Sequence, residues 1–287
     1  MEIIKAVIPR DCVIFDMSDF HVGSPNCALD TLQEVVNKIK RSRNTYVIFK
    51  GDAIECITPG DKRYTHTCVM DEYKTPKHQA DKVIEMFRPI KDRILAWGIG
   101  NHCLKLINIM DFGRFMADSL GVPYGAYVFK IHYSDPDGNF IFKSYHTHGW
   151  GNLSSNAKDD IQRDANRKAA LKQKLVASAM SDCIYMSMGH NHQLIVVDPT
   201  IQNRLALTDD GVQIHQHYHT QSHQDASSIS PDSRWYATTG RFRRLYSKPG
   251  VGATDYGEMS GYSPSEIGYA KITVKDGRIT KVDKIVA

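Results

Sequence analysis

Residues 12–19 read CVIFDMSD and residues 45–52 read TYVIFKGD, and these two stretches decide the fold. Each is a short apolar run that ends in an aspartate, the pattern typical of a buried strand followed by a loop. Between the two runs, with Asp30 as the expected N-cap, apolar residues recur at helical spacing: Leu29, Leu32, Val35, Val36 and Ile39. The segment therefore predicts a strand, a helix and a second strand, the unit that builds parallel sheets.

The same alternation continues along the first half of the chain. A helix is expected around residues 79–88, before a strand over residues 93–100 (RILAWGIG). A third helix, around residues 108–120, is expected to end at Gly121 and Pro123, which commonly terminate helices. Helices that alternate with strands in this way predict an α/β fold.

From Tyr127 the pattern changes to that of a second, antiparallel sheet. Two apolar runs are joined by the turn sequence Asp135-Pro136-Asp137-Gly138, which favours a hairpin. A polar helix over about 153–178, a strand over 183–192, a loop over 221–234 and a last hairpin with its turn at Asp276-Gly277 are expected to follow. Because the sequence contains neither a repeat nor a clear linker, residues 1–287 are interpreted as a single domain with two sheets.

Composition excludes several classes of protein. The net charge of +4 is too small for a protein that coats DNA, although it tolerates an anionic substrate. The six cysteines are scattered, which argues against a disulfide framework or a zinc knuckle. No secretory signal and no stretch of about 20 apolar residues is visible. We therefore expect a soluble cytoplasmic protein, in the host cytoplasm if a phage encodes it, and no membrane contact.

Polar side chains gather where the predicted strands end. The clusters are Asp19-Phe20-His21, Gly51-Asp52, Gly100-Asn101-His102 and Gly189-His190-Asn191-His192, with His148-Gly149 on a hairpin strand. Ligands at strand ends of an α/β fold converge on one crevice. Carboxylate, amide and imidazole groups without thiolates suit Mn²⁺, Fe or Zn²⁺. The glycines before Asp52, Asn101 and His190 would let the backbone turn sharply at these points.

The order of these motifs resembles that of the calcineurin-like metallophosphoesterase superfamily. The matching motifs extend from Asp19 to His192, about two thirds of the chain, and five of them in this order are a strong signal. Residues 257–274 (GEMSGYSPSEIGYAKITV) resemble bacterial and phage members that are often described as similar to DNA-repair exonucleases. The resemblance implies a four-layer α/β/β/α sandwich of two mixed β-sheets flanked by helices.

The resemblance also implies seven metal ligands, in two sets that share one aspartate. Asp19, His21 and His192 would hold one ion, Asn101, His148 and His190 the other, and Asp52 both. His102 would lie over the substrate phosphate and act in catalysis, together with Asn101 and Asp52. We expect two divalent ions, with Mn²⁺ preferred and Zn²⁺, Fe, Ni²⁺ and Mg²⁺ as alternatives.

Two such ions would supply a hydroxide at neutral pH for in-line attack on a phosphate ester and would neutralise the developing charge. The expected substrate is a phosphodiester in DNA, RNA or a nucleotide. A phosphomonoesterase or small-molecule phosphodiesterase is the alternative, and an inactive metal-binding scaffold is the alternative of another class. The longer connections over 56–79 and 208–231 are candidates for a lid, and the sequence does not define an oligomeric state.

One position departs from the family pattern. The family usually has Asp or Glu after Gly-Asn-His, whereas this chain has Cys103. That acidic residue is expected to steady the histidine, so the departure concerns the orientation of His102 and not the binding of metal. Glu55, three residues after Asp52, is a candidate to take its place.

Other polar residues allow two interpretations. Gly149 favours His148 over His146 as the ligand, although His146 is a candidate for lining the pocket. His215, His217 and His219, with His223 beyond, are interpreted as a hydrated strand face and not as a further metal site. Two sets of cations were weighed as contacts to a nucleic-acid backbone: Arg163, Arg167 and Lys174 on a helix, interpreted as a solvated face, and Arg241, Arg243 and Arg244, for which we expect the contact.

Overall fold

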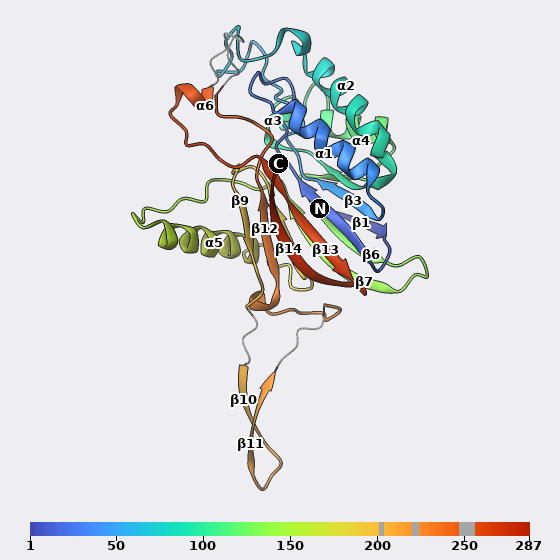
Figure 1. Cartoon of the computed structure of the whole chain (residues 1–287), viewed down its shortest axis with the longest axis vertical. Helices are drawn as coiled ribbons and strands as arrows, with labels where there is room; N and C mark the ends of the chain where they lie inside the picture. Colours follow the sequence, from blue (N-terminus) through green and yellow to red (C-terminus); the bar gives the residue numbers. More distant parts are fainter. Residues whose placement is uncertain (201–203, 220–223, 247–255) are drawn as a thin grey trace.

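The computed structural model describes residues 1–200, 204–219, 224–246 and 256–287. Two mixed six-stranded sheets pack against each other, and helices cover the outer face of each sheet (Figure 1). We refer to them as the β2 sheet and the β7 sheet, after a central strand of each. This arrangement confirms the predicted α/β fold with four layers in the order α/β/β/α.

The β2 sheet contains the two stretches that opened the sequence analysis. Its strand order is β14 (Arg278–Val286), β13 (Gly268–Lys275), β2 (Cys12–Met17), β3 (Thr45–Phe49), β4 (Ile94–Gly98) and β5 (Tyr124–Ala126). Strands β2 to β5 are parallel, whereas β13 and β14 pair antiparallel. The carboxyl ends of β2, β3 and β4 therefore meet along one edge, as the sequence predicted.

The β7 sheet is built from the second half of the chain together with the first strand. Its order is β1 (Glu2–Val7), β6 (Val128–Ser134), β7 (Phe140–Thr147), β8 (Tyr185–Met188), β12 (Trp235–Thr239) and β9 (Leu194–Val197). The predicted hairpins are confirmed: β6 pairs antiparallel with β7, and β13 with β14. The sheet is mixed, because β1 joins β6 in parallel and β8 lies parallel to both β7 and β12.

Side-chain alternation along the strands explains the layers. In β2, Ile14 points into the apolar cluster between the two sheets, while Phe15 and Met17 point to the helix-covered face. That outer face packs against α1 (Leu29–Arg41), α2 (Pro76–Phe87) and α4 (Phe112–Leu120). On the far side of the molecule, Leu171 and Leu175 of α5 (Asp160–Val176) pack against the outer face of the β7 sheet. Three apolar clusters thus hold four layers together.

Side-chain caps set the helix boundaries. The observed helices are α2 (Pro76–Phe87), α4 (Phe112–Leu120) and α5 (Asp160–Val176), against expectations of 79–88, 108–120 and 153–178. Thr75, Asp111 and Asp159 each accept a hydrogen bond from a backbone N–H of the first turn. Asp30 was wrongly expected to cap α1, because the cap position is Ala28 and Asp30 lies within the first turn.

Several short elements were not predicted from the sequence. They are β1, β5, α3 (Asn101–Leu104), α6 (Tyr256–Met259) and the 3-10 turns Asp71–Tyr73, Arg88–Arg93 and Pro231–Ser233. The expected turn between the last two strands is present, with positive φ at both Asp276 (47°) and Gly277 (72°). This is the conformation that a two-residue hairpin turn requires.

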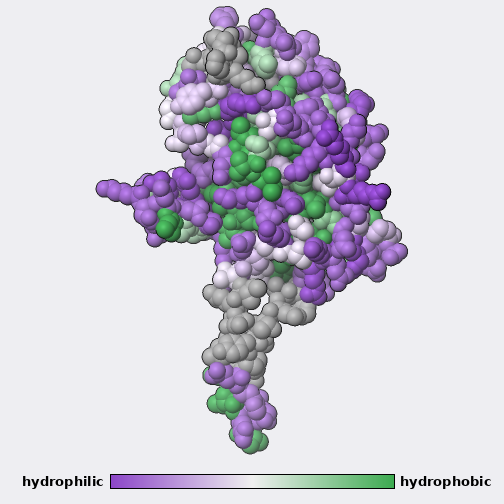
Figure 2. All heavy atoms as spheres, viewed as in Figure 1, coloured by the Kyte–Doolittle hydropathy of each residue, from purple (hydrophilic) through white to green (hydrophobic). Residues whose placement is uncertain are grey.

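A separate hairpin of β10 (Arg204–Asp209) and β11 (Ile214–His219) projects away from the two sheets (Figure 1). The apolar side chains of Leu207, Val212 and Ile214 on this hairpin are exposed. Figure 2 shows apolar surface near its end. All six cysteines are buried and free, which fits the absence of a disulfide framework expected from their scattered positions. Within the described ranges, no helix has both the length and the apolar character needed to cross a membrane.

Candidate metal centre

Strained turns follow the strands that lead into the predicted site. Asp19, His21, Asp52, His190 and His192 all have positive φ, between 53° and 69°. Side chains other than glycine rarely adopt this left-handed conformation, and such strain concentrates at functional sites. Backbone strain at these five positions lowers the stability of the folded chain and directs the five side chains toward one place.

Two glycines allow the turns to approach one another. A Cβ atom on Gly100 would lie 2.1 Å from Oδ1 of Asp52, and a Cβ atom on Gly189 would lie 2.5 Å from Oγ of Ser18. Neither position has room for any side chain. The glycines that precede Asn101 and His190 are thus required by the close packing of three loops.

The first set of expected ligands comes together at the end of β2. Nε2 of His21 lies 3.1 Å from Nε2 of His192, and Nε2 of His192 lies 3.3 Å from Oδ1 of Asp19. Oδ1 of Asp19 also lies 3.8 Å from Nε2 of His21. Two atoms that bind the same ion, each at about 2.1 Å, lie roughly 3–3.5 Å from each other. The observed separations therefore suit a single cation shared by these residues.

The second set meets on the other side of Asp52. Oδ1 of Asn101 lies 2.9 Å from Nε2 of His148 and 2.7 Å from Nδ1 of His190. Nε2 of His148 lies 3.2 Å from Oδ2 of Asp52. The structure therefore brings together residues from the ends of β3, β4, β7 and β8, at separations similar to those of the first set.

Asp52 lies between the two sets. Groups of ligand atoms within 4.8 Å of one another join Asp52 both to Asp19 with His148 and to His21 with His102. Burial alone would raise the pKa of Asp52, but the neighbouring His148 and His102 outweigh burial and hold this pKa well below its usual range. Asp52 is therefore a carboxylate, the form that can bind two cations.

Contacts to oxygen atoms orient two of the histidines. Nδ1 of His21 lies 2.8 Å from Oε2 of Glu55, and Nδ1 of His148 lies 3.2 Å from the backbone oxygen of Lys50. Burial lowers the pKa of both rings, but Glu55 beside His21 and Asp52 beside His148 outweigh burial, and the pKa of His21 is raised to about 9. A cation at Nε2 would therefore replace a proton there, while Nδ1 donates to the oxygen. Ligating histidines are commonly oriented in this way.

Oδ1 of Asp19 is among the buried polar atoms of the described residues that have no hydrogen bond. Oδ2 of Asp19 accepts from the backbone N–H of His190 and from the Ser18 hydroxyl, whereas Oδ1 is buried and accepts no hydrogen bond. An unpaired buried carboxylate oxygen is costly unless a cation binds it. The residues present therefore fit a divalent metal, and both sets contain only oxygen and nitrogen donors.

His192 is held differently from His21 and His148. Its Nδ1 faces Nη1 of Arg241 at 3.5 Å, the outer limit of a hydrogen bond. Burial lowers the pKa of His192 to about 4, in spite of the neighbouring Asp19. The ring is therefore neutral at physiological pH, as a metal ligand must be.

His102 lies beside this centre, and Glu55 does hold it. Nδ1 of His102 lies 2.6 Å from the backbone oxygen of Glu55 and 3.7 Å from the Glu55 carboxylate, which contacts His21 at the shorter distance of 2.8 Å. Glu55 thus orients His102 mainly through its backbone. Cys103 is buried, with its sulfur 4.0 Å from that of Cys56.

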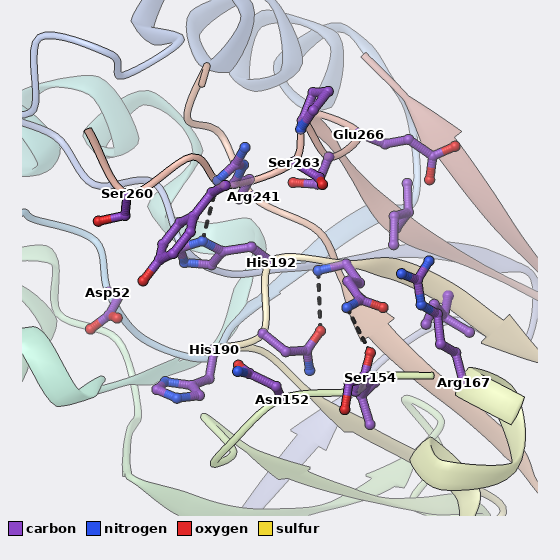
Figure 3. Close-up of a pocket in the computed structure, with 18 of the residues that line it drawn as sticks. Asp52, Asn152, Ser154, Arg167, His190, His192, Arg241, Ser260, Ser263 and Glu266 are labelled. Atoms are coloured by element: carbon purple, nitrogen blue, oxygen red, sulfur yellow. Dashed lines mark hydrogen bonds between the residues drawn. The ribbon is translucent and has the colours of Figure 1, made fainter. Parts of the chain in front are cut away.

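A large polar cleft opens above the centre, with a volume of about 1360 Å³. Asp52 and His190 lie toward one end of the cleft in Figure 3, and Arg167 and Glu266 lie toward the other. Further lining residues are Lys62, Arg63, Asn101, His102, Asn152, Ser154, Asp164, His192, Arg241, Ser260, Ser263 and Lys284. The metal centre therefore occupies only part of the cleft.

His146 does not line this cleft. It is fully buried, stacks on Phe129, and hydrogen bonds to the hydroxyl groups of Ser144 (2.6 Å) and Ser187 (2.9 Å). Among the other histidines, His215 is exposed and lies 2.8 Å from Asp210. Strand β11 also contains His217 and His219, and His223 lies outside the described residues.

The arginine segment differs from its prediction. Residues 240–246 form isolated bridges and no strand; Arg241 and Arg243 are buried, and Arg244 pairs with Asp30 at 2.7 Å. Two of the three arginines are therefore withdrawn from solvent, and only Arg244 is partly exposed. Arg241 alone of the three lines the cleft.

The basic side of α5 is only partly solvated. Lys174 donates to the backbone oxygens of Trp150 and Asn152, and Arg167 lines the cleft. Arg163 is 35% exposed and pairs with the exposed Asp160. The face interpreted as solvated is therefore partly covered by loop contacts.

No family model matches this sequence, and no curated protein matches it. Among solved structures, the chain is similar to a metallophosphoesterase from Sphaerobacter thermophilus, at 16% identity over 95% of this chain and 88% of that chain (TM-score 0.38). It is also similar to the NAD nucleotidase NadN of Haemophilus influenzae (12% identity, 96% of this chain and 49% of that chain, TM-score 0.38) and to Vps29 of Chaetomium thermophilum (10%, 96% and 97%, TM-score 0.36). The chain spans about half the length of NadN. Because these TM-scores are low, we argue the function from the geometry of the site.

Sequence analysis missed one prominent cleft residue. Arg63 lies in the connection between β3 and α2, and its Nη1 is 3.2 Å from Nε2 of His102. Residues 57–75 have no periodic pattern and no recognisable motif, so the sequence carried no signal for this contact. The position of the loop depends on tertiary packing alone.

Proposed function

We propose that this protein is a two-metal phosphoesterase that cleaves phosphodiesters in nucleic acid or nucleotides. The observation that carries the proposal is the position of Asp52 between two sets of converging ligands. Separate aspartates would bind two ions independently, whereas a shared carboxylate holds two ions as a pair. Paired divalent ions supply a hydroxide nucleophile at neutral pH and stabilise the charge that builds up during in-line displacement.

The residues of this chain would divide the work. Asp19, His21 and His192 would hold one ion, Asn101, His148 and His190 would hold the other, and Asp52 would hold both. Glu55 and the Lys50 backbone would fix the ligating tautomers. His102, fixed by Glu55 and open to the cleft, would lie next to the phosphate being cleaved.

The shape of the cleft supports an extended substrate. Its volume of about 1360 Å³ exceeds the roughly 300–1,000 Å³ typical of small-molecule pockets. Arg167 and Glu266 lie at the end of the cleft away from Asp52 in Figure 3, and Lys284, 3.9 Å from Glu266, also lines the cleft. A nucleotide chain with one phosphate at Asp52 would have a second phosphate or a base within reach of these cations.

The test is a substrate panel with Mn²⁺: single- and double-stranded DNA, RNA, cyclic nucleotides, bis-p-nitrophenyl phosphate and the corresponding monoester. We expect diester cleavage, and we expect Asp52→Asn to lower kcat/KM roughly 10⁴-fold, because it weakens both ion sites together. Bound manganese, measured by elemental analysis, should fall below two ions per chain. Asp71→Asn, at an exposed position, is the matched control and should behave as wild type.

The panel also separates the competing functions. Cleavage of the monoester alone would indicate a phosphomonoesterase. Two bound ions without activity on any compound would indicate a metal-binding scaffold. Equal activity of the wild type and Asp52→Asn on every compound would show that the two-metal proposal is wrong.

A further inference from the structure

The loop over residues 57–75 brings a cation to the edge of the metal centre. It belongs to the connection between β3, which ends at Phe49, and α2, which begins at Pro76. Both Lys62 and Arg63 from this loop line the cleft, as Asp52 and His102 do. The side chain of Arg63 is only 19% exposed, so it is a wall of the cleft and not a solvated surface residue.

Asp61 holds the guanidinium of Arg63 in a fixed orientation. Nε of Arg63 donates to one carboxylate oxygen of Asp61 at 3.1 Å, and Nη2 donates to the other at 2.8 Å. Lys105 donates to the same carboxylate at 2.9 Å, and these contacts, led by the one from Arg63, hold the pKa of Asp61 well below its usual range. A two-point contact of this kind fixes the plane of a guanidinium.

The remaining nitrogen, Nη1 of Arg63, points at His102. It lies 3.2 Å from Nε2 of His102, and because a guanidinium can only donate, Nε2 must accept. The proton of His102 is then on Nδ1, where it is donated to the backbone oxygen of Glu55 at 2.6 Å. Within this pair His102 is therefore the acceptor and Arg63 is the charged donor.

This pairing decides which residue meets an anion. A phosphate oxygen is an acceptor and gains nothing from the lone pair of His102, whereas the N–H groups of Arg63 are charged donors of suitable geometry. We propose that Arg63 is the substrate-binding cation of this site, donating to a non-bridging oxygen of the phosphate, and that Asp61 and His102 position its guanidinium. The inference rests on the proposed two-metal function and names the residue that anchors the anionic group of the substrate.

Binding of inorganic phosphate tests the inference separately from catalysis. Phosphate is titrated calorimetrically into the manganese-loaded full chain, and the manganese content of every variant is measured. We expect Arg63→Gln to weaken phosphate binding roughly 10- to 100-fold, because it removes a charged hydrogen bond. Arg63→Lys should recover part of this loss, since it restores the charge without the planar fork.

Two further variants complete the comparison. Asp61→Asn should weaken phosphate binding less than Arg63→Gln, because the cation remains but its anchor is weakened. Lys74→Gln removes the same charge from an exposed position on the same loop, where Lys74 pairs with Asp71, and should stay within about twofold of wild type. Manganese content should be unchanged in all four variants.

Failure of this inference can be told apart from failure of the proposed function. If the wild type binds manganese and phosphate, and Arg63→Gln binds both equally well, the assignment to Arg63 is wrong. If Lys74→Gln loses as much affinity as Arg63→Gln, the effect is one of general charge and the assignment is again wrong. If the wild type binds neither manganese nor phosphate, the two-metal function is wrong, and the role of Arg63 falls with it.

Discussion

Two groups of buried polar residues lie one after the other along the same strands. Asp16 precedes Asp19, Lys50 precedes Asp52, and His146 precedes His148. The first member of each pair belongs to a closed cluster between the sheets: Lys50 pairs with Asp16, the Tyr185 hydroxyl donates to Asp16 at 2.6 Å, and His146 contacts two serine hydroxyls. The second members face the candidate metal centre.

The two clusters are equally buried but differ in how their polar atoms are paired. In the closed cluster each charge meets an opposite charge or a hydroxyl. The second members, Asp19, Asp52 and His148, form what we call the open cluster. There acceptors face one another, and Oδ1 of Asp19 has no hydrogen bond. Burial alone therefore does not mark a functional site. A functional site is instead indicated by buried acceptors that converge without a donor between them, because a cation can satisfy such acceptors.

Breaking the closed cluster should give the largest effect on stability. Lys50→Met leaves Asp16 buried without its cation and should lower the free energy of unfolding by about 3–5 kcal/mol, measured by urea denaturation. Manganese content should remain that of the wild type, because only the backbone oxygen of Lys50 contacts His148.

A double variant shows whether the loss comes from the uncompensated charge. Asp16→Asn combined with Lys50→Met removes both charges and should recover at least half of the lost stability. A single variant as stable as wild type would contradict the closed-cluster interpretation.

Removing metal should act on the open cluster alone. Chelation with EDTA should lower the free energy of unfolding by about 2.7 kcal/mol for each ion that was held at 100 times its dissociation constant, a shift of roughly 5 °C in Tm per ion. The Asp52→Asn variant should respond to EDTA much less. An identical Tm with Mn²⁺ and with EDTA would mean that the acceptors converge without binding this metal.

The smallest expected effect concerns the pH dependence of the closed cluster. Burial, opposed only in part by Asp16, lowers the pKa of His146 to about 3, whereas the unfolded value is about 6.5. Between these values the unfolded chain binds a proton that the folded chain does not, so stability falls as the pH falls through this window.

The substitution His146→Gln removes this contribution to the pH dependence of stability. On going from pH 7 to pH 5 in EDTA, the wild type should lose about 2 kcal/mol more stability than the variant, as measured by denaturation at each pH. Comparing the two proteins cancels the shared contribution of the site histidines. Parallel pH profiles would show that His146 is protonated equally in both states.

Local patterns predicted the fold because they follow from backbone geometry. Alternation of Ile14 with Phe15 and Met17 places apolar side chains on both faces of β2, so a strand buried on both sides was predictable. Helix starts were less predictable, because Thr75 and Asp111 compete with other polar residues as caps. Strand β1 was missed, since charged residues interrupt its apolar run (EIIKAV) and its pairing with β6 joins distant parts of the chain.

The candidate site, like the fold, was predictable from the sequence only in part. Its strand-end ligands could be named from sequence, because the parallel strands β2 to β4 end along one edge and must bring Asp19, Asp52 and Asn101 near one another. The inward turn of Arg241 and the basic side of α5 could not be named, because exposure depends on which neighbours cover a residue.

The sequence by itself determined the alternating strands and helices and the set of polar residues at the strand ends, since both depend on local order along the chain. Only the tertiary structure decided which of those residues have partners and which converge, which separates His146 from His148 and Asp16 from Asp19. It also decided that Arg63, from a loop without any pattern, contacts His102. Pairing between distant segments depends on how the layers pack, and no local sequence signal encodes it.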